Sequence, residues 1–377
     1  MAPSTDTRPK LAWIQALRGI AVLLVVLTHA RYFFLDTPAF PLADQLLLPG
    51  AMGVDLFFVI SGFIMVYTTR HVAGTPREAG DFLVRRFARI WPLYALATIV
   101  WLTVNHRGLG WLTNWPPFRG LLLSLSFQPV DIENPLYFSA SLPLGWTLNF
   151  EMYFYLVFGL CLLLGRRRWP MLAAWIVFTV IVVPAWKRGL TLDVMSNFRF
   201  SIAYLNLVTN PIILEFLAGT AIGWLYLQDW FVLRSQTVAR HLVFLALCLA
   251  AWAAWSRFAV FHGPTQWGAV AALMVLALAL ASKTVELVPP RVLVWLGTIS
   301  FSLYLTHTTT QLLVTRTVEA LGGDTHAWSH VLLSTALSIS VAAAVYHYLE
   351  QRLSDMALGA LRRLGGKIHG RRQASAA

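Results

Sequence analysis

About ten apolar stretches, each long enough to cross a lipid bilayer, recur along this 377-residue chain. A spanning helix needs about 20 predominantly apolar residues, and hydrocarbon forces the backbone to satisfy its own polar groups. The sequence therefore predicts an all-α, polytopic integral membrane protein with about ten transmembrane helices. We place them near 11–34, 47–68, 88–104, 145–164, 169–186, 203–228, 241–260, 265–282, 292–315 and 329–350.

The composition agrees with lipid as the main solvent. Hydrophobic residues make up 58% of the chain and charged residues 12%, which lies outside the usual range of soluble domains. The net charge of +12 falls in short clusters between apolar runs, so we interpret it as cytoplasmic loop charge and exclude nucleic acid as a partner. Cys161 and Cys248 both lie in apolar runs, where they are expected to be packing residues without a disulfide or a metal.

The basic residues also predict an orientation. With a cytoplasmic N-terminus, the inside segments collect about 20 of the 29 Lys and Arg residues. The outside segments are more acidic and include Asp36, Asp131 and Glu133. Both termini are therefore predicted to be cytoplasmic.

Three regions follow from this topology. Residues 1–10 are predicted to form a cytoplasmic N-terminal segment, residues 11–352 the transmembrane domain, and residues 353–377 a cytoplasmic basic tail that is partly disordered. A further apolar run, Leu121 to Phe127, is too short to span and follows Pro116 and Pro117. We expect it to be a re-entrant or interfacial piece.

Ionisable residues inside the predicted spans are the main functional signal. A charge near the bilayer centre costs about 2.5–3.5 kcal/mol on insertion scales, so each needs a partner or a polar cavity. Arg18 and His29 are about three helical turns apart and share one face of the first span. Counting the helix rise places His29, Asp55, Glu151 and His307 in one layer in the outer half of the membrane. Such a layer predicts a polar reaction chamber between helices.

Other roles for these residues stay open from the sequence. His29 could be a hydrogen-bonded core histidine, and Asp55 could neutralise Arg18 or Arg31. We favour a base and its orienter for His29 and Asp55, because both have similar depth. For Glu350, at the inner end of the last span, we expect a structural pair with a loop arginine.

A cluster of arginines precedes Pro92 on the cytoplasmic side. Arg86 and Arg89 lie one turn apart on one face, and Arg85 adjoins them. Guanidinium forks bind phosphate in a bidentate manner, so the cluster could hold a phosphorylated ligand. It could equally be a topological anchor. Arg18 is different, because it lies about two turns inside its span.

Five short motifs carry a family resemblance. They occur in order over nearly the whole chain, so together they are far more specific than any one alone. On these residues the chain resembles acyltransferase family 3, the membrane O-acyltransferases that modify exopolysaccharide and O-antigen. The motifs are Leu17-Arg18-Gly19 with His29, the stretch from Gly53 to Phe63, Arg85 to Pro92, Trp146 to Glu151, and Ser300 to His307.

The resemblance implies transfer of an acyl group, usually acetyl from cytoplasmic acetyl-CoA, to a sugar hydroxyl. Under this interpretation the CoA phosphates are held by Arg85, Arg86 and Arg89. Arg18 lines the channel that the pantetheine arm follows outward. Acetyl-CoA is then a donor substrate, and no permanently bound cofactor or metal is expected.

The expected chemistry centres on His29. His29 removes the proton from the acceptor hydroxyl, and Asp55 or Glu151 orients the ring. A covalent acyl-His29 relay is the open variant. The candidates for binding substrate or the oxyanion are Thr147, Asn149, Tyr304 and His307.

The resemblance also implies a setting. The expected partners are acyl-CoA, the lipid bilayer and a glycan acceptor at the outer side of a bacterial cytoplasmic (inner) membrane. Some family members carry a fused outer hydrolase-like domain. This chain is expected to serve the acceptor alone, as a homo-oligomer, or with a separate acceptor-presenting protein.

Two rival functions remain. A transporter or flippase of a lipid-linked glycan could use the buried charges as a proton relay, and would predict repeat symmetry that the sequence does not show. A sensor or scaffold would leave the layer of ionisable residues without a role.

The topology is testable by cysteine accessibility in a background without Cys161 and Cys248. Thr75→Cys should react only from the cytoplasmic side and Asn134→Cys only from the outside, because the predicted third span separates them. The measurement is labelling with a membrane-impermeant maleimide in right-side-out and inverted vesicles. Labelling of both positions from one side would contradict the topology.

Overall fold

The computed structural model describes residues 11–374, which form α-helices joined by loops and short 3-10 or π-helical segments, with no strand in that range. The all-α prediction is confirmed, and helical structure occupies each predicted span. Six helical stretches of the described chain are long and apolar enough to cross a membrane, while the count of about ten spans stays a prediction. The six are Ala12–Phe34, Phe40–Thr68, Pro76–Asn105, Gly165–Lys187, Gln236–Trp255 and Trp328–Leu364.

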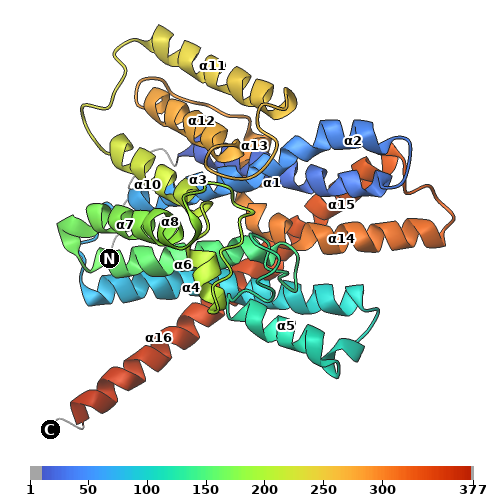
Figure 1. Cartoon of the computed structure of the whole chain (residues 1–377), viewed down its shortest axis with the longest axis horizontal. Helices are drawn as coiled ribbons and strands as arrows, with labels where there is room; N and C mark the ends of the chain where they lie inside the picture. Colours follow the sequence, from blue (N-terminus) through green and yellow to red (C-terminus); the bar gives the residue numbers. More distant parts are fainter. Residues whose placement is uncertain (1–10, 375–377) are drawn as a thin grey trace.

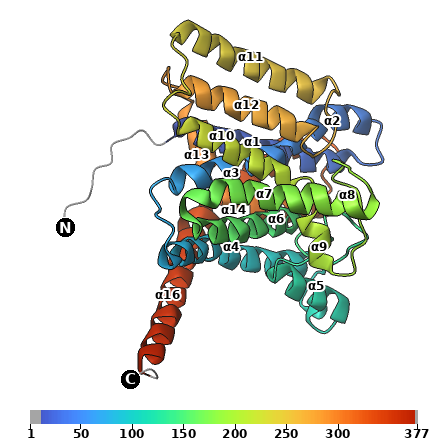
Figure 2. The same cartoon turned by 60° about the vertical axis from the view of Figure 1, so that its left-hand side comes forward.

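The helices are joined by connections of different length, and longer segments precede α6, α9 and α12 (Figures 1 and 2). The first half contains α1 (Ala12–Ala30), α2 (Phe40–Leu47), α3 (Met52–Thr68), α4 (Pro76–Asn105), α5 (Trp115–Leu125), α6 (Gly145–Leu162), α7 (Arg168–Val177) and α8 (Val183–Arg188). The second half contains α9 (Ala203–Val208), α10 (Ile213–Tyr226), α11 (Gln236–Trp255), α12 (Trp267–Ser282), α13 (Arg291–Thr298), α14 (Ser300–Ala320), α15 (Trp328–Val345) and α16 (Gln351–Ala374). The shorter segments are the 3-10 turns η1 (Arg31–Phe34), η2 (Leu48–Ala51), η3 (Gly110–Leu112) and η4 (Gly165–Arg167), and the π-helical η5 (Phe178–Val182) and η6 (Tyr346–Glu350).

Glycines bring the central helices into backbone contact. A Cβ on Gly62 of α3 would collide with the carbonyl oxygen of Phe216 in α10, and one on Gly219 would collide with that of Val59. The same relation joins Gly19 of α1 to α13, where Gly297 faces α1 in return. Small residues at such contacts let helices approach closely, which is how packing is gained where lipid supplies no hydrophobic drive.

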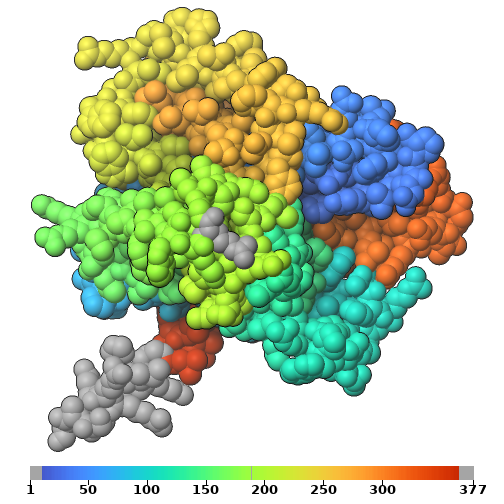
Figure 3. Space-filling view, in the orientation of Figure 1, coloured from blue at the N-terminus to red at the C-terminus, as the bar shows by residue number. Residues whose placement is uncertain are grey.

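Helix α11 lies along one edge of the molecule, packed on α12 (Figures 1 and 3). Its large side chains are exposed, among them Phe244 (69%) and Leu245 (64%). Such a row of exposed apolar side chains has lipid as its natural solvent.

Helix α4 begins well before the predicted span 88–104. Thr75 caps it: the Thr75 hydroxyl accepts from the Glu78 amide, and the Glu78 carboxylate accepts from the Thr75 amide at 2.9 Å. Pro76 occupies the first turn, where its missing donor costs nothing. The arginine cluster before Pro92 is therefore part of this helix and held at fixed spacing.

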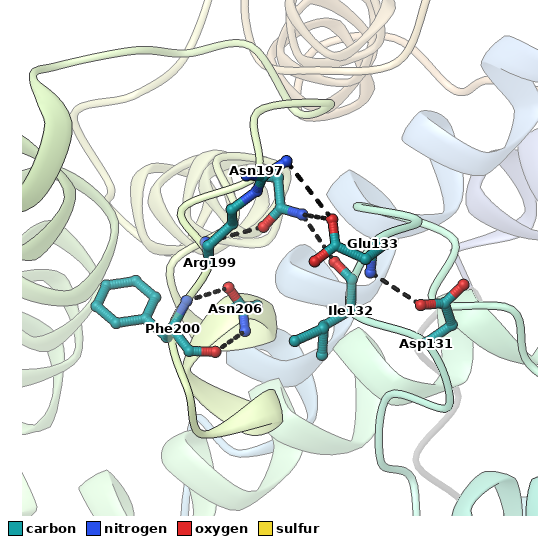
Figure 4. Close-up of polar contacts among 7 residues, drawn as sticks. All are labelled: Asp131, Ile132, Glu133, Asn197, Arg199, Phe200 and Asn206. Atoms are coloured by element: carbon teal, nitrogen blue, oxygen red, sulfur yellow. Dashed lines mark hydrogen bonds and ion pairs between the residues drawn. The ribbon is translucent and has the colours of Figure 1, made fainter.

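The segment between α5 and α6 is folded into the protein. Leu136, Phe138 and Leu142 in it are fully buried. Its outer edge is tied to the segment between α8 and α9, where the Asn197 amide donates to the Ile132 carbonyl at 2.9 Å and Arg199 lies 3.8 Å from Glu133 (Figure 4). Helix α6 consequently starts beneath a buried segment. The predicted short piece at Leu121 to Phe127 falls mostly in α5.

The C-terminal helix α16 projects from the bundle (Figures 1 and 2). The tail predicted from residue 353 to be partly disordered is helical as far as Ala374. The predicted N-terminal segment 1–10 and residues 375–377 lie outside the described residues.

The glycine contact between α3 and α10 makes a stability prediction. Gly219→Ala should destabilise the protein by about 1–3 kcal/mol, the usual range for overpacking, because the added Cβ meets fixed backbone. Gly80→Ala in α4 is the matched control, since no atom lies within 4 Å of its Cβ position. The readout is the midpoint of thermal denaturation in detergent. An unchanged midpoint for Gly219→Ala would contradict the close contact.

Candidate active site

Two cavities lie inside the bundle and share one wall. The inner cavity, of about 110 Å³, is lined by Arg18, Arg86 and Glu151 among others. The outer cavity, of about 510 Å³, is lined by His29 and other polar and aromatic side chains. Tyr304 lines both, and its hydroxyl lies 2.8 Å from the Thr147 hydroxyl. The Tyr304 side chain therefore marks the boundary between an arginine-rich and a histidine-bearing chamber.

Neutral side chains hold Arg18 and Arg86 in place around the inner cavity. Arg18 donates to the Ser300 hydroxyl at 2.9 Å and to the Gln15 side chain at 3.3 Å. The Arg86 guanidinium lies over the rings of Phe82 and Tyr155, 5.5 and 5.4 Å from their centroids. Neither contact neutralises the cation, so both guanidinium groups keep charge available for an anionic ligand.

A further cavity of about 430 Å³ adjoins the inner one beside α16. Arg18 and Arg89 line both. Arg85, predicted to act with them, is exposed and lines neither of these cavities. Glu350 was expected to pair with a loop arginine. It instead accepts a 2.5 Å hydrogen bond from Ser302 of α14.

Glu151 does not lie in the layer of His29, which corrects the sequence prediction. It lines the inner cavity, where it accepts hydrogen bonds from Tyr155 and from Ser61. The depth count failed because it assumed that α6 enters at the membrane surface, whereas α6 begins beneath the buried segment that precedes it. Glu151 therefore cannot orient His29.

His29 is oriented by the backbone and by a second histidine. Its Nδ1 lies 2.8 Å from the Val25 carbonyl oxygen. A carbonyl can only accept, so in the neutral ring Nδ1 carries the hydrogen and Nε2 holds the lone pair. His307 Nδ1 likewise donates to the carbonyls of Leu303 and Tyr304, which leaves His307 Nε2 as an acceptor 3.4 Å from His29 Nδ1. The two predicted histidines are thus brought together, and His29 Nε2 is the nitrogen left for a ligand.

Asp55 has a partner that the sequence prediction missed. Its carboxylate accepts from His262 Nδ1 at 2.7 Å and from the Gly263 amide at 3.1 Å. The predicted role of Asp55 as orienter of His29 is therefore wrong, because both its oxygens are taken by the segment between α11 and α12. His262 was overlooked because that segment is a loop in the sequence, although it stands directly before an apolar span.

A second overlooked acid, Glu215 of α10, is buried close to Asp55 and Gly263. Its position inside an apolar stretch could have identified it from the sequence, because an acidic residue within a predicted span needs a partner or a polar cavity. Of the remaining predicted residues, Thr147 reaches the boundary at Tyr304, whereas Asn149 is buried and lines neither of the two cavities.

The outer cavity has aromatic and polar walls. Tyr32, Tyr137 and Trp146 contribute rings, and Asn134 and Ser139 come from the buried segment before α6. Burial raises the pKa of Tyr137 to about 12, so its phenol stays a neutral hydrogen-bonding group. A cavity of this size, with aromatic rings and several polar side chains in its walls, suits a small-molecule or sugar ligand.

An arginine-lined chamber and a histidine-bearing chamber meet at one wall inside a helical protein with six described stretches able to cross a membrane, an arrangement that suits transfer of a group between two ligands. A family model described as an acyltransferase domain matches residues 11–347. The chain therefore belongs to acyltransferase family 3, and it is an O-acyltransferase.

Similar proteins come from several bacteria. The chain is 32% identical over 330 residues to the exopolysaccharide production protein ExoZ of Rhizobium meliloti, covering 85% of this chain and 94% of that protein. It is 26% identical over 353 residues to nodulation protein 10 of Rhizobium leguminosarum, covering 89% and 91%. A Bacillus subtilis protein named provisionally as a peptidoglycan O-acetyltransferase is 24% identical over 371 residues, covering 90% of this chain and 54% of its own length. No solved structure matches the chain.

Proposed function

We propose that this protein moves an acyl group, most simply acetyl, from cytoplasmic acyl-CoA to a hydroxyl of a sugar in a cell-surface polysaccharide or its lipid-linked precursor. The observation that carries the proposal is the pair of cavities on either side of Tyr304, one lined by arginines and one by His29. The similarity to an exopolysaccharide production protein over 94% of that protein supports a glycan acceptor. The proposed setting is a bacterial inner membrane, crossed about ten times with both termini in the cytoplasm.

The donor enters from the arginine side. CoA carries a diphosphate and a further phosphate, for which Arg18, Arg86 and Arg89 supply guanidinium groups that have no carboxylate within ion-pair distance in the described part of the chain. The inner cavity is narrow, so it takes the pantetheine arm and, beside Arg86, the diphosphate to which that arm is joined. The roomier cavity beside α16, which shares Arg18 and Arg89, takes the nucleotide. The thioester reaches the outer cavity when the hydrogen bond between Thr147 and Tyr304 opens.

The chemistry takes place at His29. Nε2 removes the proton from the acceptor hydroxyl, whose oxygen attacks the thioester carbonyl carbon. The Tyr304 hydroxyl donates to the oxyanion that forms. As the C–S bond breaks, the imidazolium returns the proton to the departing thiolate and yields the ester and free CoA. His307 Nε2 accepts from His29 Nδ1 and steadies the ring through both steps.

An acyl-His29 relay would use the same nitrogen as a nucleophile. Rapid quenching after mixing with radiolabelled acetyl-CoA, with no acceptor present, separates the two routes. Label retained on the denatured wild-type chain and absent from His29→Gln would select the relay.

The proposed direction of transfer has a direct test in sealed vesicles. Radiolabelled acetyl-CoA added to inverted vesicles, which expose the cytoplasmic face, should label glycan. The same donor added to right-side-out vesicles should not. If neither inverted nor right-side-out vesicles gave labelled glycan, the proposed function would be wrong.

Donor binding distinguishes the two kinds of arginine on α4. Arg86→Ala should weaken CoA binding by about 10- to 100-fold, because a charge-assisted phosphate contact is worth about 1.5–3 kcal/mol. Arg85→Ala, on the same helix but exposed, is the matched control, and Arg167→Ala serves as an anchor control. Calorimetric titration of the purified protein with CoA is the measurement. Equal affinity in all three variants would reduce the cluster to a topology signal.

His29 substitution tests the base. His29→Ala should keep CoA binding while transfer falls by about 10² to 10⁴, the usual contribution of general base catalysis. His29→Gln should be equally inactive, since an amide can replace a structural hydrogen bond but cannot accept the proton. Acyl transfer is measured as labelled glycan from acetyl-CoA. Near-normal transfer by well-folded His29→Gln would pass the role of base to His307.

A further inference from the structure

His262, in the wall of the outer cavity, is held by contacts on several sides. Its Nδ1 donates to the Asp55 carboxylate at 2.7 Å, and Asp55 is completely buried. The rings of Trp146, Phe261 and Trp267 surround it, with centroids 5.6, 5.4 and 5.4 Å from its own. The imidazole therefore has one orientation and one tautomer in its neutral form.

Only Nε2 of this ring remains for a ligand. Among residues 11–374 it has no hydrogen-bond partner, although His262 lines the same cavity as His29. The outer cavity is thus lined by two imidazole rings, each fixed through its Nδ1 and each with Nε2 as its remaining nitrogen. The mechanism at His29 uses one of them and leaves the second without a task.

A sugar hydroxyl fits that second nitrogen in either protonation state of the ring. A neutral imidazole offers Nε2 as an acceptor and an imidazolium offers it as a donor, and a hydroxyl can do the opposite in each case. The rings of Tyr32, Tyr137 and Trp146 add apolar faces on which a sugar ring can pack. An acceptor with one hydroxyl would leave one nitrogen unused, whereas neighbouring hydroxyls on one ring would engage both.

We propose that His262 is a specificity-determining residue for the acceptor, which is a sugar with at least two neighbouring free hydroxyls. His262 Nε2 binds one hydroxyl while its neighbour is placed against His29 and acylated. Asp55 is a positioning residue that acts through His262. The inference rests on the proposed function, and it adds the acceptor class and the choice of hydroxyl.

The test uses proteoliposomes with radiolabelled acetyl-CoA and, as acceptor, increasing amounts of membrane extract from producer cells that lack this protein. His262→Leu should raise the half-saturating amount of extract by about 10- to 100-fold, the loss expected for a hydrogen bond to a polar buried group. Half-saturation by acetyl-CoA should stay within about twofold of wild type. His262→Gln, whose amide can reach the position of Nε2, should recover part of the loss, and Asp55→Asn should give an intermediate value.

The position of the acetyl group gives a second readout. NMR of the released glycan should show one acetylated hydroxyl for the wild type and a mixture for His262→Leu. His330→Gln is the matched control, because His330 is also buried and bonded to a side chain, Thr315, but lines neither cavity. It should match the wild type in both readouts.

The outcomes distinguish failure of the proposed function from failure of the proposed role of His262. No labelled glycan from the wild type would overturn the proposed function and this inference with it. If the wild type labels glycan, and both His262→Leu and His262→Gln keep its dependence on acceptor and its position of acetylation, the inference alone is overturned. Equal losses in His330→Gln, or loss of acetyl-CoA binding in both His262 variants, would show a purely structural role and also overturn it.

Discussion

The interior of this bundle depends on the cost of an unsolvated charge. In a medium of low polarity each ionisable side chain needs a protein partner or a polar cavity. Arg18 has Ser300 and Gln15, Glu151 has Tyr155 and Ser61, and Asp55 has His262 and Gly263. These partners come from helices and loops far apart in the chain, so satisfying the charges also fixes how the helices meet.

Helix α14 contacts polar groups of both cavities. Ser300 binds Arg18, Ser302 binds Glu350, Tyr304 lines both cavities, and His307 faces His29. Over about two turns one helix therefore reaches the inner cavity, the boundary and the outer cavity. A small shift of α14 along α1 would change all of these contacts together. The close packing of α1 on α13 at Gly19 and Gly297, immediately before α14, limits such a shift.

The two cavities suit opposite needs of one reaction. The proposed donor, acyl-CoA, is a large anion, and binding it calls for guanidinium groups that are available to phosphate. Proton removal calls for a neutral imidazole. Tyr304 lies between the cavity of Arg18, Arg86 and Arg89 and the cavity of His29, where Arg31 in the lining is paired with Asp44 at 3.3 Å. In the proposed reaction the acyl group would pass from one cavity to the other beside Tyr304, which lines both.

Much of this protein was readable from the sequence alone. Long apolar stretches predicted helices, because only a continuous helix satisfies the backbone in lipid, and the periodicity of 3.6 residues placed Arg18 and His29 on one face. Five ordered motifs indicated the family, and two arginines of the third motif, Arg86 and Arg89, line the inner cavity. Each of these inferences depends on residues close together in sequence or on one helix, where local geometry is sufficient.

The tertiary structure decided which side chains meet across helices. Depth counted along a helix is only as good as its assumed starting point, and α6 starts beneath a buried segment whose mixed apolar and polar residues gave no sign of burial. Glu151 therefore belongs to the inner cavity and not to the layer of His29. The partner of Asp55 comes from a loop 207 residues further along the chain, and a loop has no periodicity from which its depth could be inferred. Sequence determined the helices and their polar faces, whereas the pairing of buried charges followed from packing between segments that local rules do not connect.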